Sequence, residues 1–403
     1  MPEERGVAIT GLGLVLPQGV GLAAVEDVFA GRSAVRYLPE FADVPGATGA
    51  AVLDFVPPSG TADCDRAIQF AVAAADEAWN HAGLADAAPA PDRVATVLSL
   101  SKGAIFSLAH QARCGGAGSD ALLDVTPAAA ARTVAARLGL TGPIAAPVTA
   151  CASGGHALVL GAGLIRRGVV DAALVGAAEA SLHPMILGSY RRMGVLADAG
   201  ADPATSVRPF SASRRGFAIG EGAGVLVLES TASAERRGAQ RIALVRGWAS
   251  GCQTAGLIDV ETGGETLAHL LRLTLKRAGT PPEGVDYVHA HGTATVKGDA
   301  AEARAIRMAL GKEADRVSVS STKGSHGHLL GAATAVELVL TVLAIRRGIV
   351  PPTANLTDPD PEIGLDCTPL TARRRPIRRA LKMAGGFGGQ MLAVVLAAPE
   401  ARR

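Results

Sequence analysis

Two segments that begin 180 residues apart have similar sequences with almost the same ending, and this repeat limits what the chain can fold into more than any other feature. The first is CASGGHALVLGAGLIRRGVV (residues 151–170) and the second is GAATAVELVLTVLAIRRGIV (residues 331–350), with nine identities in twenty positions. Each is predicted to form a buried helix after a turn of small residues. Two copies are too few for a solenoid, so the repeat indicates a duplicated globular fold.

Strand-like segments follow the helix in both halves. In the first half these are DAALVGAAEA (residues 171–180) and the glycine-rich GFAIGEGAGVLVLES (residues 216–230), and in the second half the hairpin MAGGFGGQMLAVVLAA (residues 383–398). Strands that alternate with helices predict an α/β fold in which the two repeated helices pack between sheets.

The duplication divides the chain into two expected halves, residues 5–232 and residues 233–399. Between the first strand and the first repeated helix lies a long stretch, about residues 40–145, which is expected to be an insertion in the first half. Its loops are expected to form walls of a substrate site, because connections carry most of the variable chemistry of a fold.

The composition excludes several classes of protein. A formal net charge of +2, from 39 basic and 37 acidic residues, gives no indication of a nucleic-acid partner. The five cysteines are far apart and include no CxxC pair, so neither a zinc site nor a disulfide framework is predicted. The N-terminus does not resemble a signal peptide, and a cytoplasmic location is expected.

One apolar stretch, GHLLGAATAVELVLTVLAIRRG (residues 327–348), approaches the length of a membrane span. Glu337 lies in its middle, and a carboxylate is costly in lipid. The small residues suit a helix that is buried on all sides in a large protein core. We therefore expect a buried helix here and no membrane span.

Cys151 lies between the apolar segment PVTA (residues 147–150) and the first repeated helix. At the N-terminus of a helix, unpaired amides and the helix dipole favour a thiolate, so this position suits a nucleophile. A buried structural cysteine is the common alternative, and this stretch alone does not decide between the two.

Two further segments place histidines at strand ends. HAHGTATVKGD (residues 289–299) presents His289 and His291 on one face, where one of them could simply pack. STKGSHGHLLGAATAVE (residues 321–337) carries Lys323 and His328 at a helix entrance.

Neither segment indicates a metal or a nucleotide. The HxH pair has no further His or Cys nearby, and the phosphate-loop spacing GxxxxGK[ST] is absent around Lys323. One cysteine and two histidine clusters at equivalent edges of a duplicated core instead predict a nucleophile served by two imidazoles.

Seven motifs, in order along nearly the whole chain, resemble those of the elongating β-ketoacyl-acyl carrier protein synthases of the thiolase superfamily. They are VAITGLGLVLPQG, DRAIQFAVAAADEAWNHAGL, TACASGGHAL, RPFSASRRGFAIGEGAGVLVLE, HAHGTATVKGD, STKGSHGHLLGAATAVE and GGFGGQ. The resemblance implies a thiolase-like fold, in which the duplicated halves form a five-layered αβαβα core.

The resemblance also implies roles for eleven residues. Cys151 would be the acyl-accepting nucleophile, with a gating phenylalanine beside it, and the amides of these two residues would form an oxyanion hole. The implied catalytic residues are Cys151, His291, His328 and Lys323, the implied supporting residues are Asp299, Glu337 and Phe387, and the implied substrate-binding residues are Thr293, Thr295, Phe217 and Ile105.

The implied reaction is a decarboxylative Claisen condensation. An acyl chain held on Cys151 would combine with malonyl-acyl carrier protein to give a 3-oxoacyl-acyl carrier protein, in fatty acid or in polyketide or polyene elongation. No cofactor is expected, because phosphopantetheine arrives on the carrier protein. The expected partners are that carrier and either a second copy of the chain or a ketosynthase-like chain-length subunit.

The residues present argue against two other classes of protein. A non-catalytic chain-length subunit would lack the nucleophilic cysteine, whereas Cys151 is present with both histidines. An acyl-CoA thiolase would need a second catalytic cysteine near GGFGGQ, and Cys367 is too far upstream. His326 stands where the family usually has a small hydroxyl residue, and the resemblance gives it no role.

Overall fold

Ten strands of the computed structural model, which describes residues 5–41, 44, 47–114 and 124–400, form two matching sets of five. The N-terminal set is β1 (Val7–Leu16), β9 (Gly222–Ser230), β7 (Ala172–Glu179), β5 (Val94–Leu100) and β6 (Ile144–Ala145); the C-terminal set is β10 (Ala243–Cys252), β16 (Gln390–Ala397), β15 (Arg379–Gly386), β11 (Tyr287–His289) and β12 (Ser318–Ser320). Taken in this order, each set has two antiparallel pairings followed by two parallel ones. The duplication predicted from the repeat is therefore confirmed.

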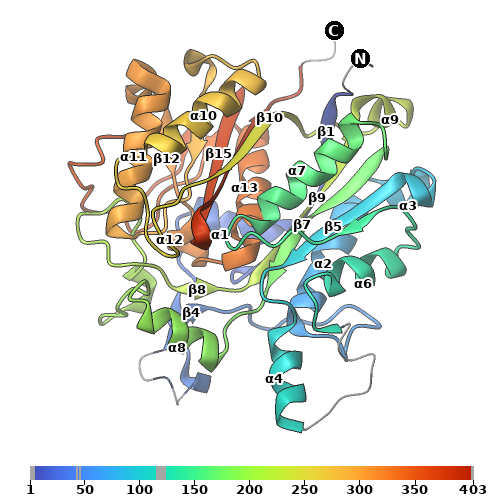
Figure 1. The fold of residues 1–403 in the computed structure, drawn as a ribbon, viewed down its shortest axis with the longest axis horizontal. Helices are drawn as coiled ribbons and strands as arrows, with labels where there is room; N and C mark the ends of the chain where they lie inside the picture. The colour runs from blue at the N-terminus through green and yellow to red at the C-terminus, as the bar shows by residue number, and fades with distance from the viewer. Residues whose placement is uncertain (1–4, 42–43, 45–46, 115–123, 401–403) are drawn as a thin grey trace.

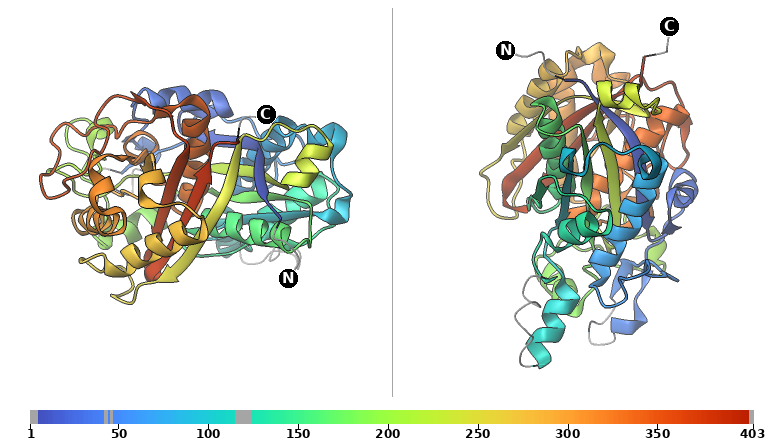
Figure 2. Two further views of the ribbon diagram at one scale, coloured as in Figure 1. Left: turned by 90° about the horizontal axis from the view of Figure 1, so that it is seen from above. Right: turned by 90° about the vertical axis from the view of Figure 1, so that its right-hand side faces the viewer.

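Helices cover the sets in layers (Figure 1 and Figure 2). Packed on the outer face of the N-terminal set are α2 (Arg66–His81) and α6 (Ala129–Arg137), and on that of the C-terminal set α10 (Glu265–Arg277) and α11 (Val296–Leu310). The repeated helices α7 (Ser153–Arg166) and α13 (Ala333–Arg347) lie between the sets. The predicted five-layered αβαβα core is confirmed.

The two sets are not separate sheets. β1 and β10 pair antiparallel through three residue pairs, Val7 to Ile9 with Val245 to Ala243, and so join the sets into one 11-stranded sheet that includes β2 (Gly19–Val20). Each set keeps its own helical cover on its outer face.

α13 is the apolar stretch whose length approached that of a membrane span. Every residue from Ala333 to Ile345 is buried, because the helix is enclosed by both sets of strands and by α7. No helix in the described ranges is long and apolar enough to cross a membrane.

The insertion expected at about residues 40–145 is smaller than that range. Three elements in that range belong to the layers, because each has a counterpart in the second half at the same place in the fold. β5 corresponds to β11 in strand order, and α2 and α6 cover the outer face as α10 and α11 do. β4 (Thr48–Ala50) and α4 (Ile105–Cys114) lie outside the layers, and α4 protrudes from the body (Figure 1 and Figure 2). Residues 115–123, which were included in the expected insertion, lie outside the described residues.

Short elements complete the described chain. They are α1 (Val25–Phe29), β3 (Arg36–Tyr37), α3 (Leu84–Ala87), α8 (Pro184–Arg192), β8 (Ile219–Gly220), α9 (Thr231–Arg236), α12 (Lys323–His326), β13 (Ile349–Val350) and β14 (Arg373–Arg374). β3, β4 and β8 form a small sheet of their own.

The backbones of α7 and α13 lie close together at Gly154, where an added Cβ would lie 2.5 Å from the Cβ of Ala335 and 2.7 Å from its amide nitrogen. We expect Gly154→Ala to lower the free energy of unfolding by roughly 1–3 kcal/mol, because the core has no room for the methyl group. Urea unfolding measures this change.

Gly163→Ala is the matched control, since Gly163 lies in the same helix and an added Cβ would meet nothing within 4 Å. It should raise the free energy of unfolding by about 0.5–1 kcal/mol through better helix propensity. Similar effects of the two substitutions would contradict the close helix contact.

Candidate active site

A cavity of about 510 Å³ opens beside Cys151. Seven of the eleven residues predicted for the site line it, and they come from both halves of the chain: Cys151, His291, His328, Thr293, Thr295, Phe217 and Phe387. Lys323, Asp299 and Glu337 are buried behind this wall. Ile105 is not among the lining residues, because it begins the protruding helix α4.

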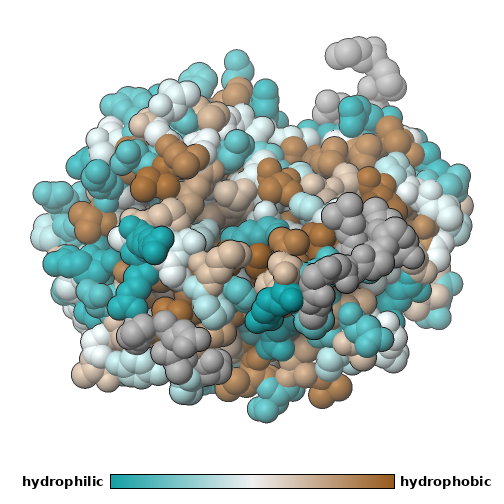
Figure 3. Space-filling view, turned by 60° about the horizontal axis from the view of Figure 1, so that its bottom comes forward, coloured by the Kyte–Doolittle hydropathy of each residue, from teal (hydrophilic) through white to brown (hydrophobic). Residues whose placement is uncertain are grey.

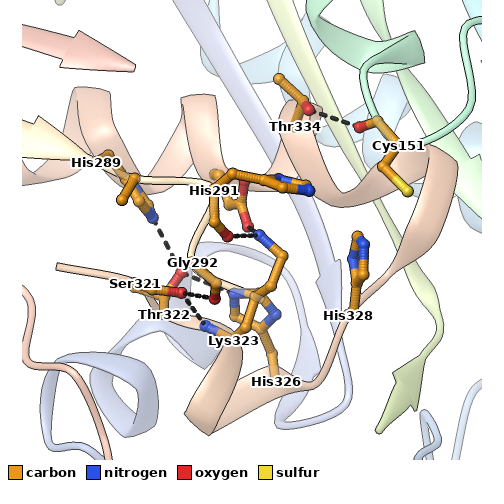
Figure 4. Close-up of polar contacts among 12 residues, drawn as sticks. Cys151, His289, His291, Gly292, Ser321, Thr322, Lys323, His326, His328 and Thr334 are labelled. Carbon is orange, nitrogen blue, oxygen red and sulfur yellow. Dashed lines mark hydrogen bonds and ion pairs between the residues drawn. The ribbon is translucent and has the colours of Figure 1, made fainter. Parts of the chain in front are cut away.

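Cys151 sits in a tight turn before α7. Ala150 has a φ of +49°, a left-handed conformation that few residues with a side chain adopt. The turn is held by Ser153, whose Oγ accepts the Thr149 amide at 2.9 Å, and by Thr334 of α13, whose hydroxyl donates to the Cys151 carbonyl at 2.7 Å. The sulfur points to the side on which the His328 ring lies (Figure 4), and His291 lines the same cavity.

The thiolate expected from the helix N-terminus is not favoured in this structure. Burial raises the pKa of the Cys151 thiol to about 11, although the charges of Lys102 and Lys323 oppose that rise. The sequence pattern identified the helix end correctly, but it did not show how completely the sulfur is enclosed. Cys151 therefore rests as a thiol.

His328 has a defined tautomer. The backbone amide of Leu330 donates to its Nδ1 at 3.3 Å, so the ring proton lies on Nε2. Burial, with the charge of Lys323, holds the pKa of His328 well below its usual value, and the ring is neutral. It stands edge-on to His291 with 5.4 Å between ring centroids, and edge-on to Phe217 at 4.8 Å.

The backbone on both sides of the His291 Cα is fixed by charged groups. The Glu302 carboxylate accepts the amides of His291 at 3.0 Å and Gly292 at 2.6 Å, and the Lys323 ammonium donates to the His291 carbonyl. Burial, together with Lys323 and His328, lowers the pKa of His291 well below its usual value. Its Nδ1 is buried and has no hydrogen-bond partner among the described residues.

Lys323 and Glu337 form a fully buried ion pair behind the histidines. Burial alone would raise the pKa of Glu337, but the ammonium groups of Lys323 and Lys382 hold it well below its usual value. Glu337 therefore remains a carboxylate in the middle of α13.

Asp299 and Glu302 lie one turn apart on α11. Asp299 accepts the Phe210 amide at 2.8 Å, and burial next to Glu302 raises its pKa to about 7. Glu302 lines the cavity and accepts the amide of His291, and it is not among the residues predicted from sequence. The sequence feature that could have identified Glu302 is its position three residues after Asp299, because side chains at this spacing are neighbours on a helix.

The remaining predicted residues shape the cavity. Thr293 and Thr295 lie with their hydroxyl oxygens 3.1 Å apart at the start of α11. A Cβ on Gly386 would lie 3.2 Å from the Cys151 amide nitrogen, so the chain leading into Phe387 runs directly against the cysteine turn. The Phe387 ring lies 6.0 Å from that of Tyr190.

Two other histidines contribute to packing. His289 contacts the hydroxyls of Thr341 at 2.8 Å and Thr322 at 3.2 Å, and His326 contacts Thr322 at 2.8 Å and the Gly327 carbonyl at 2.8 Å. Neither lines the cavity. Within the described part of the chain, no group of three or more His, Cys, Asp or Glu side chains could hold a metal ion.

Comparison with known families decides the relationship. The chain matches the model of the β-ketoacyl synthase N-terminal domain over residues 4–234 and that of the C-terminal domain over residues 242–357. The chain belongs to the β-ketoacyl synthase family. The resemblance inferred from the seven motifs, and with it membership of the thiolase superfamily, is confirmed.

The chain is similar to several proteins that are named as ketosynthases of polyketide assembly. It is 36% identical, over 99% of both chains, to the tetracenomycin polyketide synthase ketoacyl synthase alpha subunit of Streptomyces glaucescens. A second match is one chain of a solved structure described as a type II PKS acyl carrier protein in complex with its ketosynthase bound to the hexaketide. That chain superposes with a TM-score of 0.92 at 31% identity, and the alignment covers 98% of this chain and 100% of that one. The ishigamide ketosynthase/chain length factor gives a TM-score of 0.89 at 31% identity, with the same coverage.

The burial of the Cys151 thiol leads to a prediction about alkylation. The rate at which iodoacetamide modifies Cys151 should rise about tenfold per pH unit between about pH 7 and pH 10, because the thiolate fraction grows steadily below a high pKa. Peptide mapping would follow Cys151 and, as a check on the reagent, the exposed Cys252. A rate that reaches a plateau near about pH 8 would show that the thiol ionises more easily than its burial indicates.

Proposed function

We propose that the chain catalyses a decarboxylative Claisen condensation in polyketide or fatty acid chain elongation. An acyl group held on Cys151 would combine with malonyl-acyl carrier protein to give a 3-oxoacyl-acyl carrier protein and carbon dioxide. The observation that carries the proposal is the convergence of one thiol and two neutral imidazoles on one cavity.

The first half-reaction is acyl transfer. The Cys151 sulfur attacks the thioester carbonyl of the acyl carrier, the carbon–sulfur bond to the carrier breaks, and the proton of Cys151 leaves with the carrier thiol. The amides of Cys151 and Phe387 are the proposed donors to the oxyanion that forms in between. Their closeness is supported by the contact of Gly386 with the cysteine turn.

The second half-reaction is decarboxylation followed by condensation. The carbon–carbon bond to the malonyl carboxylate breaks and carbon dioxide leaves. The electron pair of that bond stays on the remaining carbon and forms an enolate, whose oxygen needs hydrogen-bond donors. The Nε2 proton of His328 is available for this purpose, since Nδ1 is occupied by Leu330. The enolate carbon then attacks the acyl group, and Cys151 departs and regains a proton.

The proposed partners are an acyl carrier protein and a second ketosynthase-like subunit, either identical or of the chain-length type. β6 ends the sheet, and Ile144 in it and Val148 just after it are exposed, so this edge can pair with another subunit. The end of the molecule that carries α4 and α8 shows hydrophobic groups between hydrophilic ones (Figure 3). The hydroxyls of Thr293 and Thr295 line the cavity and are proposed to bind the pantetheine amides.

A non-catalytic chain-length role is the alternative. Such a subunit needs no nucleophile, whereas here Thr334, Ser153 and the strained Ala150 all fix the cysteine turn against the two histidines. This arrangement favours catalysis.

Cys151→Gln should separate the two half-reactions. Condensation should be lost, because no thioester can form, while malonyl decarboxylation should persist or increase, since a carboxamide in the oxyanion site imitates the acyl-enzyme. Carbon dioxide release and protein acylation would be measured separately. Loss of both activities in a folded variant would refute the assigned role of Cys151.

His328→Ala should fail in the opposite half. Decarboxylation should fall by roughly a hundredfold or more, the usual effect of losing one oxyanion donor, while some acylation of Cys151 remains. His326→Ala is the control, because His326 is buried nearby but does not line the cavity. Normal decarboxylation by His328→Ala would show that this imidazole is not the donor.

A further inference from the structure

Lys382 is a second buried lysine beside the histidines, and the proposed reaction gives it no role. It lies on β15 and is 1% exposed. Its ammonium donates to three backbone carbonyls, those of His289 at 3.3 Å, Ala290 at 3.1 Å and Met383 at 2.6 Å. It also lies 2.8 Å from Oε2 of Glu337, on the opposite oxygen from Lys323.

These contacts make Lys382 part of the support of His291. Two of the three carbonyls belong to the residues directly before His291 at the end of β11. Lys323 holds the carbonyl of His291 itself, so two lysines on different elements hold three consecutive carbonyls. A buried ammonium that satisfies its donors in this way fixes the backbone that carries the imidazole.

The charge of Lys382 matters as well as its hydrogen bonds. Lys323 and Lys382 both flank Glu337, and Glu302 adds a second carboxylate where it accepts the amides of His291 and Gly292. Burial lowers the pKa of Lys382 to about 8, while Glu337 opposes the shift, so the ammonium stays protonated at neutral pH. Without Lys382, the two carboxylates of Glu337 and Glu302 would face the single ammonium of Lys323.

On the basis of the proposed condensation, we propose that Lys382 is a positioning residue for the decarboxylation half-reaction. It holds the backbone before His291 and supplies a second positive charge behind that ring. A buried cation there stabilises an enolate that forms on the other side of the imidazole. It also disfavours a proton on His291, which keeps that ring neutral.

The effect should be confined to one half-reaction. The charges that act most strongly on the Cys151 thiol are Lys102 and Lys323, with Glu179 and Glu337. Lys382 acts on His291 instead. The ionisable groups around His291 are Lys323 of α12, Lys382 of β15, Glu337 of α13, Glu302 of α11, and Cys151 and His328 of the adjoining loops.

The test compares Lys382→Met, which removes both charge and donors, with Lys382→Gln, which keeps an N–H donor but no charge. Carbon dioxide release from malonyl-acyl carrier protein and acylation of Cys151 would be measured across pH. We expect both variants to decarboxylate about tenfold more slowly or worse, with acylation within about twofold of the parent. The acid side of the decarboxylation profile should move to higher pH, because His291 loses a repelling cation and gains protons more easily.

Tyr287→Phe is the matched control for damage to the core. Tyr287 lies on β11, is fully buried, and its hydroxyl is 2.8 Å from that of Ser320. Its loss should destabilise the same strand and leave the pH profile of decarboxylation unchanged. Urea unfolding of all three variants relates activity to stability.

Three outcomes would overturn the inference. The first is decarboxylation by Lys382→Met at the rate of the parent protein. The second is decarboxylation at the parent rate by Lys382→Gln, which would leave Lys382 only a hydrogen-bonding role. The third is an equal loss of acylation and decarboxylation, which would indicate general damage to the fold. Failure of the proposed function itself is distinguishable, since the parent protein would then neither acylate Cys151 nor release carbon dioxide.

Discussion

The close contact between α7 and α13 determines how the two halves of this chain meet. Both helices are enclosed between the strand sets, and at Gly154 the backbones are near enough to exclude a methyl group. The same contact places Thr334 of α13 on the carbonyl of Cys151. Packing in the central layer therefore fixes the distance between the Cys151 thiol of the first half and the imidazoles of the second.

Much of this architecture could be predicted from sequence because duplication leaves a direct record. The repeated ending around Arg166 and Arg346 predicted the two central helices, and the layers followed from the alternation of strands and helices. The extent of the insertion was wrong because β5 and α2 are core elements of the first half whose counterparts in the second half share no evident motif. Spatial equivalence, and not sequence identity, shows that they belong to the layers.

The site was predicted in part for a similar reason. Residues at strand and helix ends, such as Cys151, His291 and His328, lie in recognisable motifs. Glu302 and Lys382 act on the backbone around His291 from other elements, and their partners are carbonyls and amides, which every sequence contains. The pKa of Cys151 was also beyond sequence reasoning, because it depends on enclosure by many side chains.

The two halves are joined in one sheet by the three residue pairs between β1 and β10, and this join affects the order in which the protein folds during synthesis. During synthesis the N-terminal strands and Cys151 emerge before β11 and the loop of His328 have been made. The nascent chain thus carries the Cys151 thiol before it carries His291 and His328. The three side chains come together only when the second half has folded against the first. The cavity that both halves line is therefore complete only at the end of folding.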